Sequence, residues 1–133
     1  MHAHERAAQI WPLLCFAAMN RQILTYKLVG GLIGVPHYAL AQLLEPIQSY
    51  CLLHSLPALT VLVVNNEGRP GTGFIAAEDV PAEQARVFRH DWQEEATPLP
   101  ETLLAAVRQL PSCGIPEAAQ VIVEGGSAAA GGA

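Results

Sequence analysis

The fold is decided by residues 25–36, which read Thr25-Tyr26-Lys27-Leu28-Val29-Gly30-Gly31-Leu32-Ile33-Gly34-Val35-Pro36. Thr25 stands where a helix N-cap is expected, because its hydroxyl can accept a hydrogen bond from a free backbone N–H of the first turn. The apolar residues of 26–33 share one helical face and are Leu28, Val29, Leu32 and Ile33. Gly34 predicts the end of this helix, and Val35-Pro36 favours an extended or turn conformation.

A second helix is predicted directly after this turn. It runs from His37 to about Ser55, with an apolar stripe made of Leu40, Leu43, Leu44, Ile47 and Leu52. Pro46 lies inside the stretch and predicts a kink or a division of the helix in two. Two helices joined by a tight glycine turn are typical of a helix-turn-helix motif.

Residues 59–64 have a different pattern. They read Leu59-Thr60-Val61-Leu62-Val63-Val64, and this continuous, β-branched run predicts a buried strand. Asn66 to Gly71 have turn chemistry, and Gly73-Phe74-Ile75 is predicted as the partner strand. A hairpin after a helix-turn-helix predicts a wing. The predicted fold class is therefore α+β: a winged helix-turn-helix with a β-hairpin wing and additional C-terminal helices.

Helices are also predicted on both sides of this central motif. The first covers about Glu5 to Asn20, with Pro12 as an alternative start, and is followed by a short extended run at Ile23-Leu24. Later helices are predicted over Pro81 to Trp92, introduced by Asp79, and over Glu101 to Leu110. We expect a single domain over residues 1–123 and a flexible Gly/Ala tail over residues 124–133.

Composition restricts the class of protein. The chain has 133 residues, of which 51% are hydrophobic and 14% charged, as expected for one core-rich domain. No apolar stretch approaches the roughly 18–20 residues that a membrane span needs. The leading segment, Met1 to Gln9, has Glu5 beside Arg6 and carries no net positive charge of the kind that a secretory leader has. We therefore expect a cytoplasmic protein with no membrane partner.

The charge argues against a protein that holds nucleic acid mainly by electrostatics. The formal net charge is −5, and Lys27 is the one lysine in the sequence. Neutralising phosphates requires clustered lysine and arginine side chains. Any nucleic-acid function therefore has to account for this acidic balance.

The cysteines and histidines predict neither a metal site nor catalysis. Cys15, Cys51 and Cys113 form no CxxC pair, so we expect them reduced and buried. Cys51 and His54 stand three apart on a helix, but no oxyanion hole or orienting residue accompanies them. His90-Asp91 and the N-terminal histidines offer too few ligands for zinc. No cofactor and no catalytic residue are predicted.

Three segments carry a resemblance to a known family. Residues 23–28 read Ile-Leu-Thr-Tyr-Lys-Leu, residues 39–44 read Ala-Leu-Ala-Gln-Leu-Leu, and residues 63–69 read Val-Val-Asn-Asn-Glu-Gly-Arg. Together with Gly34, they resemble the winged-helix DNA-binding domain of alkylguanine-DNA alkyltransferases and alkyltransferase-like proteins. The resemblance covers about residues 23–74, just over a third of the chain.

The resemblance also shows where the family's chemistry is lacking. Aligning Val63-Val64-Asn65 on the family's Val-Val-Asn places Thr60 at the alkyl-accepting cysteine. Val61 then stands at the family's histidine and Leu62 at its arginine. A thiolate nucleophile needs both the sulfur and a base that lowers its pKa. The resemblance therefore implies a protein without alkyl transfer, and incubation with alkylated-guanine DNA should leave its mass unchanged.

The candidate DNA-binding residues follow from the motif and the resemblance. The resemblance implies phosphate contacts by Thr25 and Tyr26, and it places the family's intercalating arginine near Tyr38. With His37 and Gln42, Tyr38 is expected on the exposed start of the second helix, where side chains stack on bases or read their edges. Arg69, at the tip of the expected wing, is the candidate phosphate contact. Each candidate has an alternative explanation without DNA. The face around Tyr38 is then an ordinary solvated helix face, the Tyr26 ring packs against the first helix, and Arg69 is an ordinary surface arginine.

Two functions of different classes remain open. The first is non-catalytic binding of double-stranded DNA by the helix-turn-helix and wing, which the resemblance favours. The second is a protein-interaction or dimerisation module of the same fold that does not bind DNA, which the acidic charge favours. An enzyme ranks behind both, because no catalytic constellation is visible.

Overall fold

The computed structural model describes residues 1–71 and 74–111. The elements, with η for a 3-10 helix, are α1 (Ala3–Met19), β1 (Leu24–Thr25), α2 (Tyr26–Ile33), η1 (His37–Ala39), α3 (Leu40–Leu53), η2 (Leu59–Leu62), β2 (Val63–Val64), α4 (Val80–Arg89), η3 (Trp92–Glu94) and α5 (Pro100–Gln109). The architecture is α+β, with helices around a small parallel sheet. Cys113 and the predicted tail, residues 124–133, lie outside the described residues.

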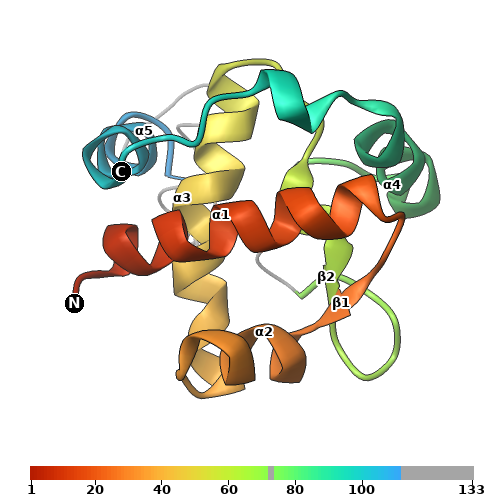
Figure 1. Ribbon diagram of the computed structural model, residues 1–133, viewed down its shortest axis with the longest axis horizontal. Helices are drawn as coiled ribbons and strands as arrows, with labels where there is room; N and C mark the ends of the chain where they lie inside the picture. The colour runs from red at the N-terminus through yellow and green to blue at the C-terminus, as the bar shows by residue number, and fades with distance from the viewer. Residues whose placement is uncertain (72–73, 112–133) are drawn as a thin grey trace.

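Helix α1 crosses the middle of the molecule and packs against α3, α5 and η2 (Figure 1). Its buried residues recur every three or four positions and include Ala7, Ile10, Trp11, Leu14, Ala17 and Ala18. The Trp11 ring meets Tyr50 of α3 and Trp92 of η3 edge to face, with ring centroids 5.5 and 6.0 Å apart. Pro12 lies inside α1 and is not its start. Its side chain is exposed, away from the core.

Helix α2 spans residues 26–33, as predicted, because its ends are determined by local contacts. The Thr25 hydroxyl accepts a hydrogen bond from the Leu28 N–H over 3.1 Å, which confirms Thr25 as the N-cap. Gly34 ends the helix in the left-handed conformation with φ of 77°. The Arg6 guanidinium also donates to the Ile33 carbonyl over 2.8 Å, which satisfies a free C=O at the C-terminal end of α2.

The second helix of the motif is confirmed, with a different start. The chain leaves Pro36 as the 3-10 turn η1 and then continues as α3 to Leu53. Pro46 is buried inside α3, which runs past it as one α-helix. Ser55, the predicted last residue, lies outside the helix in the left-handed region with φ of 55°.

The prediction of a strand over residues 59–64 is wrong for its first four residues. Leu59–Leu62 form the 3-10 helix η2, opened by a hydrogen bond from the Val61 N–H to the Ala58 carbonyl. All four residues are buried, and a short apolar run that is buried on all sides has no periodicity to separate strand from helix. Only Val63–Val64 are extended.

The predicted hairpin wing is also wrong for the described residues. Val63–Val64 pair in parallel with Leu24–Thr25, in the register Leu24↔Val63 and Thr25↔Val64. Phe74 belongs to no strand, and its N–H donates to the Gly71 carbonyl over 3.0 Å. Gly73 of the expected return strand lies outside the described residues. The strand partner of residues 63–64 therefore comes from the segment before α2.

The C-terminal helices form near the predicted positions. Helix α4 is introduced by Asp79, whose carboxylate accepts from the Ala82 N–H over 3.1 Å, and it ends at Arg89. Trp92 was expected in this helix but lies in η3, with its indole N–H donating to the Val87 carbonyl over 2.8 Å. Across the described ranges, 1–71 and 74–111, we find no helix that is both long and apolar enough to span a membrane.

Candidate functional site

The start of α3 presents three of the predicted residues to solvent. Tyr38 in η1 is 79% exposed, and its ring lies edge to face against His37 with centroids 5.9 Å apart. Gln42, four residues after Tyr38 in α3, is also exposed. The structure therefore brings His37 and Tyr38 together before α3, whereas Gln42 also lines a hollow with His4 of α1 and Leu104 of α5.

The turn that positions this surface depends on two glycines. At Gly30, an added Cβ would lie 2.6 Å from the Val35 carbonyl oxygen, because the chain returns closely over α2 after the turn. The Gly30 carbonyl accepts the N–H groups of both Gly34 and Val35. Gly34 supplies the positive φ that the turn needs. These contacts determine where η1, which begins at His37, lies relative to α2.

Arg69 lies at the end of a tight turn that follows β2. The Asn65 side-chain oxygen accepts from the Glu67 and Arg69 N–H groups over 2.9 and 3.2 Å. The Asn65 N–H donates to the Arg69 carbonyl over 2.7 Å, and Gly68 has the positive φ of 81° that such a turn requires. The turn predicted over Asn66 to Gly71 is therefore organised by the side chain of the preceding residue, Asn65. The Arg69 side chain is exposed.

Tyr26 and Thr25 act within the protein rather than as free surface groups. The half-buried Tyr26 ring packs against the core, and its hydroxyl accepts from the Gly71 N–H over 2.8 Å. A Cβ at Gly71 would overlap this hydroxyl. The Thr25 hydroxyl caps α2. Sequence reasoning considered packing for Tyr26 but could not locate Gly71, which lies 45 residues away.

The acidic excess of the described residues lies in the segment 74–111. Residues 1–71 hold four basic and three acidic side chains, whereas residues 74–111 hold three basic and seven acidic ones. Figure 1 shows α4, η3 and α5 at the top, and α2 with the loop after β2 at the bottom. Of these acidic residues, Asp91, Glu94 and Glu95 lie in or beside η3, whereas Glu78 and Asp79 line the same cleft as Arg69.

The two described cysteines are poor nucleophiles. Burial raises the pKa of Cys15 to about 12, and the nearby Glu95 carboxylate acts in the same direction. Burial also raises the pKa of Cys51 to about 12, against a smaller opposing effect of the Leu59 backbone. The His54 ring packs against Tyr50, with centroids 4.2 Å apart. Among residues 1–71 and 74–111, no cluster of three or more His, Cys, Asp or Glu is arranged to hold a metal.

Thr60, the residue aligned with the family's acceptor cysteine, is buried at 4% exposure. Its hydroxyl has no hydrogen-bond partner within the described part of the chain. We expect Thr60→Val, which keeps the side-chain shape, to raise the free energy of unfolding by about 1 kcal/mol, because it removes an unpaired polar group. Urea denaturation measures this change.

A matched control for Thr60 is Ser49, which is also buried. Its hydroxyl donates to the Leu110 carbonyl over 2.6 Å, so Ser49→Ala removes a satisfied hydrogen bond. We expect that variant to lose about 1 kcal/mol. Destabilisation by Thr60→Val would show that the hydroxyl makes a favourable interaction.

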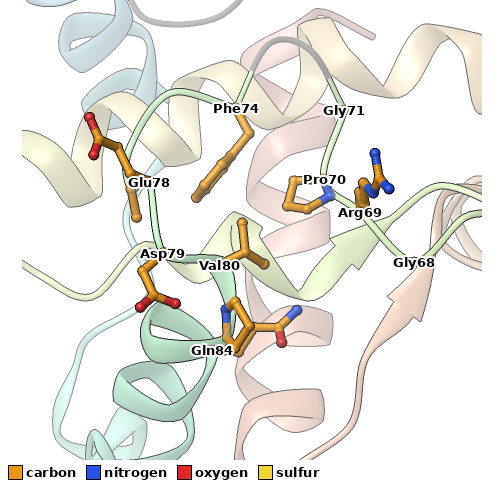
Figure 2. A pocket seen from close by; sticks show the side chains of 11 residues that line it. Gly68, Arg69, Pro70, Gly71, Phe74, Glu78, Asp79, Val80 and Gln84 are labelled. Carbon is orange, nitrogen blue, oxygen red and sulfur yellow. The ribbon is translucent and has the colours of Figure 1, made fainter.

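A cleft of about 810 Å³ lies between the Arg69 loop and the start of α4 (Figure 2). Phe74 and Pro70 on the loop side face Val80 and Gln84 on the helix side. The Gln84 amide donates to the Val61 carbonyl over 3.4 Å, and the Asp79 carboxylate caps α4. Two exposed charged side chains, Arg69 and Glu78, also line the cleft.

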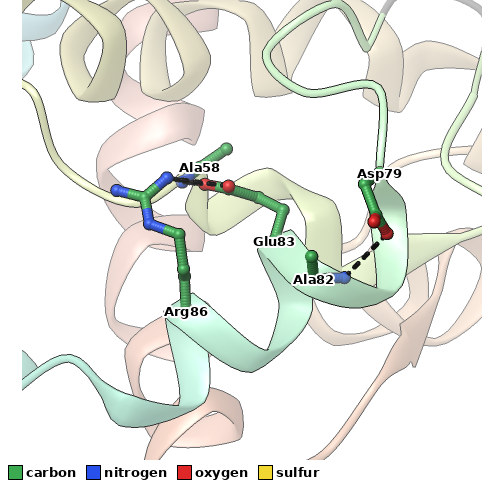
Figure 3. A network of polar contacts seen from close by, with 5 residues as sticks. All are labelled: Ala58, Asp79, Ala82, Glu83 and Arg86. Atoms are coloured by element: carbon green, nitrogen blue, oxygen red, sulfur yellow. Dashed lines mark hydrogen bonds and ion pairs between the residues drawn. The ribbon is translucent and has the colours of Figure 1, made fainter.

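Glu83 is a buried carboxylate that sequence reasoning missed. It is 6% exposed, and one oxygen accepts from the Ala58 N–H over 2.7 Å (Figure 3). Both oxygens also lie 2.8–3.0 Å from a guanidinium nitrogen of Arg86. Glu83 therefore joins α4 to the residue before η2, and its partners assign it to the fold rather than to proton transfer.

Comparisons with known proteins found no relative of this chain. No protein-family model matches the chain, and neither the curated proteins nor the solved structures include a significant match.

Proposed function

We propose that this chain is a non-catalytic DNA-binding protein of the winged-helix type. The start of α3 contacts the bases, and the loop over residues 65–71 takes the place of the wing. The observations that carry the proposal are an exposed aromatic side chain, Tyr38, and an exposed cation, Arg69. Tyr38 follows the end of α2, and the loop that carries Arg69 leaves the sheet beside the start of α2. The resemblance to alkyltransferase-like proteins supports the same interface.

The local charge supports this proposal despite the net charge of −5. Exposed basic residues lie in α2 and in the loop, Lys27 and Arg69, and a third, Arg21, follows the end of α1. The exposed Glu67 lies in the same loop as Arg69, and Glu78 and Asp79 line the cleft beside it, so the positive charge available to a duplex is small. Three phosphate contacts predict weak, salt-sensitive binding.

The proposal predicts that two single substitutions both weaken DNA binding but differ in their effect on its salt dependence. Tyr38→Ala should weaken binding about tenfold with an unchanged salt slope, because stacking on a base involves no counterion. Arg69→Ala should weaken binding to every sequence alike and reduce the slope by about one. Fluorescence anisotropy of a labelled duplex, measured across a salt series, separates the two effects. If both variants bound like the parent, this interface would be wrong.

A second candidate is a protein-interaction or dimerisation module, which a different observation favours. Leu28 and Leu32 lie four residues apart on α2 and are 48% and 59% exposed. Two leucines at this spacing form an apolar strip on the outer face of the helix. If the strip mediates dimerisation, sedimentation should show a concentration-dependent dimer that the double variant Leu28→Gln and Leu32→Gln abolishes. DNA binding without such a dimer favours the first proposal.

A further inference from the structure

The loop that carries Arg69 is attached to the start of α2 at both of its ends. At the first end, Val64 pairs with Thr25 in the parallel sheet. At the second end, the Gly71 N–H donates to the Tyr26 hydroxyl over 2.8 Å. Because Thr25 and Tyr26 are consecutive, two adjacent residues hold both ends of the loop against the same helix start.

The loop between these attachments is itself well ordered by hydrogen bonds. The Asn65 side chain accepts two backbone N–H groups, and the Asn65 N–H donates to the Arg69 carbonyl. Arg69 stands two residues before Gly71, so its backbone lies close to the second attachment. A cationic residue held in place before binding loses less conformational freedom when it contacts a phosphate.

We propose that Tyr26 is a positioning residue for Arg69, an inference that rests on the proposed function. Through Gly71, the Tyr26 hydroxyl holds the loop so that Arg69 and the start of α3 meet one duplex surface together. This role differs from the direct phosphate contact that the resemblance implies for Tyr26. It also accounts for glycine at position 71, where a Cβ would overlap the tyrosine hydroxyl.

The test uses Tyr26→Phe, which keeps the packed ring and removes only the hydroxyl. We expect this uncharged substitution to reduce the salt slope of DNA binding by about one, as Arg69→Ala does. We also expect Arg69→Ala to weaken binding about tenfold in the parent and less than about twofold in the Tyr26→Phe background, since coupled residues are not additive. In the free protein, the Gly71 amide should exchange with solvent faster in Tyr26→Phe than in the parent.

Tyr50→Phe is the matched control, because it removes another half-buried tyrosine hydroxyl from a different part of the core. It should leave the salt slope and the effect of Arg69→Ala unchanged. If Tyr26→Phe weakened binding with an unchanged slope and additive losses, the tyrosine would contact DNA directly and only this inference would be overturned. Unchanged Gly71 exchange would also overturn it. A parent protein that forms no complex would overturn the proposed function itself, and the inference with it.

Discussion

Replacing Gly30 by alanine is expected to lower the free energy of unfolding by about 2 kcal/mol, a cost typical of overpacking. The new Cβ would lie 2.6 Å from the Val35 carbonyl oxygen and 3.5 Å from the His37 backbone. These are backbone atoms, so relief requires the turn to move away from α2. The same movement displaces η1, and DNA binding through Tyr38 should weaken beyond the loss of stability.

The neighbouring Gly31 supplies the control, because both glycines lie inside α2. No atom lies within 4 Å of the position of an added Cβ at Gly31. Gly31→Ala should therefore stabilise the protein by about 0.5–1 kcal/mol, the usual preference of a helix for alanine over glycine. The melting temperature should fall for Gly30→Ala and rise for Gly31→Ala, by about 4 °C for each kcal/mol of stability. Equal shifts would mean that the turn does not pack closely over Gly30.

Removal of the Glu83 carboxylate is expected to have the second large effect. Glu83→Ala leaves the buried Ala58 N–H without its acceptor and opens a small cavity at the join between α4 and η2. We expect a loss of about 3 kcal/mol, most of it from the unpaired donor and the lost packing. The ion pair contributes less, because the Arg86 side chain is half exposed.

Two variants separate these contributions. Glu83→Gln keeps an oxygen for the Ala58 N–H and should lose about 1 kcal/mol, whereas Glu78→Ala, at an exposed position, should be within about 0.5 kcal/mol of the parent. Fluorescence of the two buried tryptophans, Trp11 and Trp92, reports unfolding in urea. Equal losses in Glu83→Gln and Glu83→Ala would show that the hydrogen bond to Ala58 is not the dominant interaction.

The parts of the fold that were predictable from sequence have short-range causes. Helix α2 was predicted to the residue because Thr25 caps it through a contact three residues away, and Gly34 ends it by its own conformation. The exposed start of α3 followed from the same turn. The N-cap role of Asp79 and the turn around Asn65 are likewise local.

The parts that were not predictable depend on contacts between distant segments. The strand at residues 63–64 pairs with residues 24–25. Strands of two residues are too short to show the alternation of apolar and polar residues from which a strand and its partner are predicted. Glu83 is buried because the Ala58 N–H, 25 residues earlier, needs an acceptor there. The contact from Tyr26 to Gly71 spans 45 residues. The net charge of −5 for the whole chain also concealed the near-neutral charge of residues 1–71.

The most direct test of the account is the binding of the parent protein to a short labelled DNA duplex, followed by anisotropy from about 50 to 200 mM salt. The account predicts a complex at the lowest salt and a plot of log K against log salt with a slope of about −2 to −3, because Arg21, Lys27 and Arg69 are the exposed basic side chains of residues 1–71. No complex at the lowest salt, together with a concentration-dependent dimer in sedimentation, would contradict it.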